Sequence, residues 1–315
     1  MGQIDSKTNE YMSDSARFAD VFNFYLYDGE PVIRPEALRE MDRSVVALPY
    51  GADARSSETI QNYRDVIRLL TAKEDDQAAY LLLGIEDQAF VHYAMPVRNM
   101  LYDAAQYGKQ VESAARAHRA EMSAKKIRSD EFLSGFYKED RLLPVITLVI
   151  YWSPEAWDGP KSLHQMLSIK ERRLLQFIPD YQINLISPEQ IDDKDFERFR
   201  TTVGETFQFI KYSKDDKKLR ELVNRNKEFQ HLDRRSVEVI NAITGSSFTV
   251  PEGREEVNMC VAIQEIERKA TEKAVDHTLI HSIRSLMETM KWTAQQAMDA
   301  LKISTEDQKR YLAML

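Results

Sequence analysis

The chain has 315 residues, 43% of them hydrophobic, which is enough for one large core or two ordinary ones. Glycine and proline number only ten each, which excludes a collagen-like or low-complexity chain. The formal net charge of −8 counts against a uniformly basic nucleic-acid-binding surface. Binding depends on local rather than summed charge, so nucleic acid stays among the candidate partners.

Cysteine usage and hydropathy indicate the compartment. Cys260 is the only cysteine, which excludes an internal disulfide and argues against a cysteine-based zinc site. Residues 1–7 lack the apolar segment of a signal peptide. The longest apolar run, residues 142–152, is too short to span a bilayer. We therefore expect a cytoplasmic protein without a membrane partner.

The first two thirds of the chain alternate between helical and strand-like patterns. We expect residues 1–13 to be irregular, and a helix to run over 16–26 because a cap precedes it and Gly29 ends it. A long helix is expected over 97–122. Strands are expected over 44–48, 63–71, 78–86, 142–151 and 181–186. The strand at 142–151 follows a crossover helix, so it should join the sheet in parallel.

From residue 192 onward the pattern is helical and charged. A long helix is expected from near Arg254, and two short ones over 293–301 and 304–315. The sequence therefore predicts an α/β domain over residues 1–190 and an α-helical region over 191–315. Long charged helices with apolar stripes also favour self-association, and we expect a homodimer formed through this region.

Two acidic residues stand out in the α/β part. Asp65 and Glu86 lie in two apolar runs joined by a polar turn at 73–77. In a hairpin the two carboxylates would sit on neighbouring strands at one end of a sheet, where they can hold Mg²⁺, Mn²⁺ or Ca²⁺. Gln88 shares the face of Glu86 by strand alternation. The pattern favours phosphodiester hydrolysis; the alternative is that both acids are surface residues at strand ends.

Cations and amides after the second acid are candidate DNA contacts. Arg98 and Gln106 share a face of the expected long helix, together with Tyr102. That face either looks onto the acidic pair and contacts phosphate, or forms a helix–sheet seam. Arg64, next to Asp65, is a further candidate.

Several longer segments make the chain resemble a known family. They are residues 18–23, 47–51, 62–66, 79–88, 92–99, 132–141, 209–213 and 297–303. With these segments the chain is similar to the PD-(D/E)XK nuclease superfamily. Within it, the chain resembles the Rpn/YhgA-like recombination-promoting nucleases and transposases, over nearly its whole length.

The resemblance implies a restriction-endonuclease-like αβββαβ core and a metal-dependent DNA endonuclease that promotes recombination or transposition. Asp65 and Glu86 take the places of the motif's two acids, and Asp20 on the first helix takes that of an assisting metal ligand. Gln88 stands where many members have lysine, which removes a cation from the scissile phosphate. Arg64 or Arg98 would then substitute for it.

The neutral Gln88 and the negative net charge leave a second hypothesis open. The chain would then have a catalytically degenerate nuclease fold, acting as a DNA-binding or protein-interaction module in mobile-element or phage-defence systems.

Overall fold

The computed structural model describes residues 3–41, 70–86, 93–121, 135–250 and 253–315. These form two compact units, of which the first comprises Met1–Ser246 with Val250–Val257 and the second Ser247–Thr249 with Asn258–Leu315. The boundary expected at residue 190 lies inside the first unit. Helices that follow the sheet in sequence share a core with helices that precede it, which holds them in one unit.

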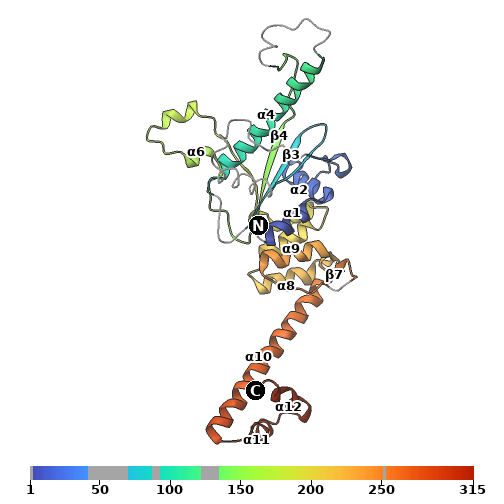
Figure 1. Cartoon of the computed structure of the whole chain (residues 1–315), viewed down its shortest axis with the longest axis vertical. Coiled ribbons are helices and arrows are strands. Elements are labelled where there is room, and N and C mark those ends of the chain that lie inside the picture. Colours follow the sequence, from blue (N-terminus) through green and yellow to red (C-terminus); the bar gives the residue numbers. More distant parts are fainter. Residues whose placement is uncertain (1–2, 42–69, 87–92, 122–134, 251–252) are drawn as a thin grey trace. The chain divides into compact units, whose positions relative to one another are not determined.

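The described strands of the first unit form a five-stranded mixed sheet in the order β1-β2-β3-β4-β5 (Figure 1). Their bounds are β1 (Arg39–Glu40), β2 (Leu70–Glu74), β3 (Ala79–Glu86), β4 (Val145–Trp152) and β5 (Asn184–Ile186). The pairs β1–β2 and β2–β3 are antiparallel, whereas β3–β4 and β4–β5 are parallel. The helix α4 (Met95–Glu121) connects β3 to β4. The expected α/β class and the parallel β4 are confirmed.

The other elements of the first unit are mostly helical. They are α1 (Gln3–Met12), α2 (Ser15–Tyr27), η1 (Pro35–Ala37), α6 (Leu163–Met166), η3 (Arg172–Phe177), η4 (Pro188–Gln190), η5 (Asp193–Arg198), α7 (Val203–Tyr212), α8 (Asp216–Arg225), η6 (Lys227–Gln230) and α9 (Arg234–Thr244), with a two-stranded ladder of β6 (Leu232–Asp233) and β7 (Glu256–Val257). The Asp14 side chain caps α2 by accepting from the N–H groups of Ala16 and Arg17. The predicted start of this helix is therefore correct.

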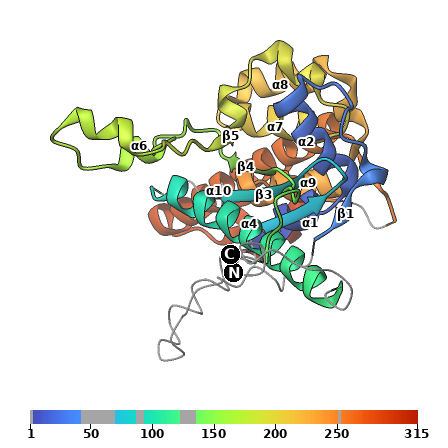
Figure 2. The same cartoon turned by 90° about the horizontal axis from the view of Figure 1, so that it is seen from above.

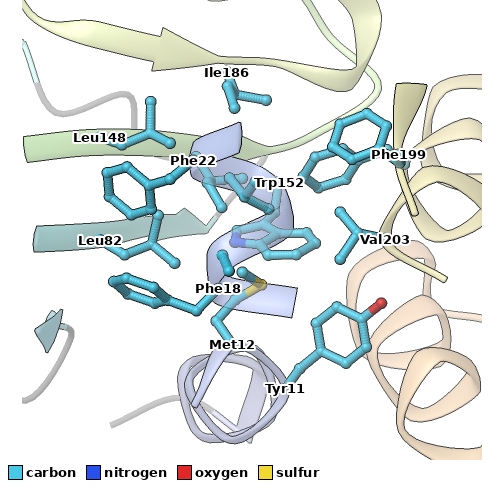
Figure 3. Close-up of a cluster of buried hydrophobic side chains, with 14 of the residues drawn as sticks. Tyr11, Met12, Phe18, Phe22, Leu82, Leu148, Trp152, Ile186, Phe199 and Val203 are labelled. Atoms are coloured by element: carbon cyan, nitrogen blue, oxygen red, sulfur yellow. The ribbon is translucent and has the colours of Figure 1, made fainter. Parts of the chain in front are cut away.

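Both faces of the two central strands are covered, and side-chain alternation decides which residue meets which layer. Leu82, Leu148 and Trp152 point to a core with α1, α2, α7 and α9 (Figure 3). Leu81 and Val149 point to the opposite core with α4. Burial on both faces explains why these strands read as continuous apolar runs.

The prediction that residues 1–13 are irregular is wrong. Residues Gln3–Met12 form α1, and its last turn enters the core: Tyr11 is 1% exposed and Met12 is 3% exposed. The Tyr11 and Trp152 rings meet edge to face, with centroids 6.2 Å apart. A mostly polar ten-residue helix is marginal in isolation, so its burial against the sheet and α9 stabilises it.

The hairpin turn also begins later than expected. Lys73 belongs to β2 rather than to the turn, and its ammonium group pairs with Glu40 and lies 3.2 Å from Ser15 Oγ. Asp75 organises the turn by accepting from the N–H groups of Gln77 and Ala78. The expected strand at 44–48 lies outside the described residues, as does most of the one at 63–71.

A partly buried polar network joins the helices on the α1 side of the sheet. Asp233, the N-cap of α9, accepts from Arg17 (2.9 Å), from Ser236 Oγ (2.7 Å) and from the Thr202 hydroxyl (2.5 Å). The Tyr11 hydroxyl lies 3.2 Å from Ser236 Oγ, which links α1 to the same network. Burial raises the pKa of Asp233, but these hydrogen bonds and the Arg17 guanidinium outweigh it, so the pKa lies below its ordinary value.

Asp233→Asn should therefore destabilise the protein by about 2–3 kcal/mol at pH 7, because it removes charge-assisted hydrogen bonds. Since the folded pKa is lowered, this stability is present above the unfolded pKa of about 3.9 and is lost as pH falls through the lower folded value. Urea unfolding at pH 7 and pH 3 should show a difference between wild type and variant that shrinks in acid. The control is Asp215→Asn, an exposed N-cap on α8, and an equal loss at both pH values would contradict the prediction.

The second unit contains α10 (Met259–Met290), α11 (Ala294–Ala300) and α12 (Thr305–Leu312). Its small core consists of Ile283, Ala297, Met298 and Tyr311. Asp276 on α10 accepts a hydrogen bond from Tyr311 at 2.7 Å, and Thr293 and Gln296 form a capping box at the start of α11. Helix α10 begins at Met259, later than expected. Among the described residues no helix is both long and apolar enough to cross a membrane.

Candidate functional site

The sequence places the acidic pair at the C-terminal end of β3. Glu86 is the last residue of β3 and pairs in register with Trp152, the last residue of β4. Leu70, the first residue of β2, pairs with Leu83, so the chain enters β2 at the same end of the sheet at which β3 ends. Asp65, Arg64 and Gln88 lie outside the described residues, as does the side chain of Glu86.

The first turns of α4 cover this end of the sheet from one side. Met95, Asn99 and Tyr102 form one helix stripe at spacing i, i+4, i+7, and all three are at most 5% exposed. Met95 and Tyr102 pack into the core with Trp157. The Arg98 guanidinium lies 6.0 Å from the centre of the Tyr102 ring.

Unpaired polar atoms gather on these turns. Asn99 is fully buried, and within the described part of the chain neither its amide nitrogen nor its amide oxygen has a hydrogen-bond partner. Arg98 Nε and Trp157 Nε1 are also buried without partners there. A buried polar group left unpaired costs about 1–3 kcal/mol, so each such group calls for an explanation, such as strain, a catalytic role, or a bound water or ion.

A hydrogen-bonded carboxylate fixes the next turn of α4 on the sheet. Asp103 accepts from the hydroxyls of Thr147 on β4 and Tyr181, both at 2.5 Å. Burial raises the pKa of Asp103, while the two hydrogen bonds oppose the shift. Further along α4, the Tyr107 hydroxyl accepts from the Val145 N–H at 3.1 Å. These contacts hold Arg98 and Asn99 in place at the end of the strands.

The two predicted DNA-contacting residues that the structure describes, Arg98 and Gln106, lie in different places. Arg98 lies at the edge with Asn99, whereas Gln106 is 3% exposed and lies in the seam between α4 and the sheet, not on an open surface. Sequence reasoning missed Asn99. The available signal was an amide interrupting the apolar stripe of Met95 and Tyr102.

Asp20 has a different environment. Both of its carboxylate oxygens accept the Arg200 N–H at 3.0 Å, and one also accepts the N–H and hydroxyl of Thr201, at 2.8 and 2.6 Å. Burial raises the pKa of Asp20, and the hydrogen bonds from Thr201 and Arg200 oppose it. The carboxylate thus ties α2 to the segment before α7. Its role as a metal ligand stays a prediction that no described contact supports.

Asp20→Asn should destabilise the fold by about 1–3 kcal/mol, since an amide offers one acceptor oxygen and sets its own N–H groups against backbone donors. The control is Asp28→Asn at the C-cap of the same helix, where the carboxylate is 90% exposed and, among the described residues, pairs with Arg198. That change should stay within about 0.5 kcal/mol. Urea-unfolding midpoints for the two variants test this, and equal stability would contradict the structural role.

Comparisons with known proteins give no functional assignment for the chain. No protein-family model matches the chain, and no curated protein or solved structure matches it either. Among the described residues, no three or more His, Cys, Asp or Glu side chains are grouped so that they could hold a metal ion. The side chains of the expected ligands Asp65 and Glu86 lie outside the described part of the chain, so that statement does not cover them.

Asn99→Leu should raise the free energy of unfolding by about 1 kcal/mol, because an apolar side chain of the same branching removes two unpaired buried polar atoms. Thermal unfolding measures this. The control is Asn23→Leu, because the buried Asn23 amide hydrogen-bonds both the N–H and the C=O of Ile33 and its loss should destabilise. Destabilisation of both variants alike would show that Asn99 is paired in solution.

Proposed function

We propose that this protein is a metal-dependent DNA endonuclease that promotes recombination or transposition. The observation that carries the proposal is the strand register. Strand β3 ends at Glu86, and the chain enters β2 at the same end of the sheet, shortly after Asp65 in the sequence. A carboxylate at the end of a buried strand, next to the entry of an antiparallel neighbour, is the arrangement that the resemblance to PD-(D/E)XK nucleases implies.

Asp65 and Glu86 are the residues that would hold Mg²⁺, with Mn²⁺ or Ca²⁺ as substitutes. Carboxylate oxygens are suitable ligands, and Mg²⁺ needs only one or two of them when water and phosphate supply the rest. When bound, the metal supplies neutralisation of the phosphodiester charge and activation of water. Asp20 fits this role less well, because both of its oxygens already accept hydrogen bonds from Arg200 and Thr201.

The chain's own donors would position the substrate at this edge. Arg98, on the first turns of α4, is partly exposed, and within the described residues its Nε has no hydrogen-bond partner, so its guanidinium has hydrogen-bonding capacity for a phosphate. In this proposal Arg98 or Arg64 provides the cation that Gln88 lacks, and Gln88 orients water or contacts the phosphate. Placing donors in a closed, partly apolar setting strengthens their effect on developing charge.

A nuclease that cuts both strands benefits from two active sites, so a homodimer formed through the helical C-terminal region belongs to the same proposal. The alternative, a degenerate nuclease fold that binds DNA or protein without cleaving, makes the opposite prediction for activity.

A plasmid-nicking assay with Mg²⁺ or Mn²⁺ tests the activity. Asp65→Asn and Glu86→Gln should each lower the cleavage rate at least about a hundredfold, because loss of a ligand removes most of the metal's stabilisation of charge. The control is Asp76→Asn, an exposed acid in the turn at the opposite edge of the same hairpin, which should leave the rate unchanged. Absence of cleavage by wild type with every metal, or full cleavage by Asp65→Asn, would favour the degenerate fold.

A further inference from the structure

The segment between β4 and β5 forms an arm over residues 161–183 that projects away from the sheet in both views (Figures 1 and 2). Its base is a short antiparallel ladder between two segments of the chain. The Leu163 N–H donates to the Tyr181 carbonyl at 2.9 Å, and the Ile183 N–H donates to the Lys161 carbonyl at 3.0 Å. An isolated bridge pairs Ser162 with Gln182. The arm is therefore anchored where it leaves the sheet.

A second set of contacts holds the arm just beyond its base. The His164 N–H donates to the Asp180 carboxylate at 2.9 Å, and His164 Nε2 lies 2.7 Å from the Ile178 carbonyl oxygen. The hydrogen bond from the His164 N–H is the main cause that lowers the pKa of Asp180. These contacts close a loop whose tip contains η3.

The tip combines cations with exposed apolar side chains. Lys170, Arg172 and Arg173 are exposed, and none of their side chains forms an ion pair within the described parts of the chain. Leu174 is 52% exposed and Phe177 is 76% exposed, the largest value among the exposed large hydrophobic residues that the structure describes. Residues three apart in a 3-10 helix eclipse each other, so Leu174 and Phe177 share one side of η3.

We propose that this arm is a DNA-contacting element, in which Lys170, Arg172 and Arg173 bind backbone phosphates and Phe177 inserts against the bases. The inference rests on the proposed function for its choice of polyanion. Unpaired cations next to an exposed apolar wedge are what proteins use to hold and unstack DNA. Residues 161–183 carry four Lys or Arg side chains against the two acids Glu171 and Asp180, which gives the arm a local positive charge on a chain of net charge −8.

A second copy of the chain fits the tip less well. The buried core of a protein–protein interface is depleted in charged residues, and burying three unpaired cations there would need matching acids. At a DNA backbone the same cations need no partner from the protein, because each one replaces a condensed counterion.

Fluorescence anisotropy with a labelled DNA duplex tests the arm, using full-length Asp65→Asn protein so that cleavage does not interfere. Arg172→Ala/Arg173→Ala should weaken binding about tenfold at low salt and reduce the slope of log K against log salt by about 2. Phe177→Ala should weaken binding about fivefold or more with the slope unchanged. The charge-matched control is Lys217→Ala/Lys227→Ala, two exposed lysines on α8 and η6, which should change neither quantity.

The outcomes separate this inference from the proposed nuclease activity. Unchanged affinity and slope in the arm variants, with normal plasmid cleavage in an otherwise wild-type chain, would overturn the arm and leave the activity standing. Loss of binding in the arm variants, with no cleavage by wild type, would support the arm and overturn the activity. Light scattering that shows a dimer lost in the arm variants while DNA affinity is unchanged would assign the tip to a second copy and overturn the proposal.

Discussion

Burial of both faces of β3 and β4 is the constraint on which the rest of the first unit depends. Leu82, Leu148 and Trp152 need one cover, and Leu81 and Val149 need another, so helices must pack on both sides of the sheet. Helix α4 supplies one cover as it connects the two parallel strands. The other cover comes from helices that precede and follow the sheet in sequence, which brings distant segments into one core.

Polar groups are buried under both covers. On the α1 side, Asp233, Arg17 and Ser236 satisfy one another in a network that joins four helices. On the α4 side, Asn99 and Arg98 Nε are buried without partners in the described structure, at the end of the strands. Trp152 Nε1, on the α1 side, is also buried without a partner among the described residues, so the α4 side is distinguished by the adjacent Asn99 amide and Arg98 Nε rather than by unpaired groups as such.

The same contrast separates two kinds of acidic residue. Asp20 and Asp103 are held by hydroxyl and N–H donors, which stabilises helix contacts and leaves little capacity for a ligand. Asp65 and Glu86 belong to the proposed site, which rests on chain direction, on the register of β2 and β3, and on the resemblance in sequence. The proposed division of labour is therefore structural for the paired acids and catalytic for the two at the sheet edge, with the arm over 161–183 as a separate contact for the substrate.

Periodicity and apolar runs determined the central strands, the long helix α4, the cap of α2 and the mixed α/β class, because these signals are local in the sequence. Tertiary structure alone decided that residues 3–12 form a helix, because its stability comes from burying Tyr11 against Trp152. It also decided that Asp20 faces Thr201 and that Asn99 has no hydrogen-bond partner among the described residues. A residue's partners come from distant parts of the chain, and no local pattern records them.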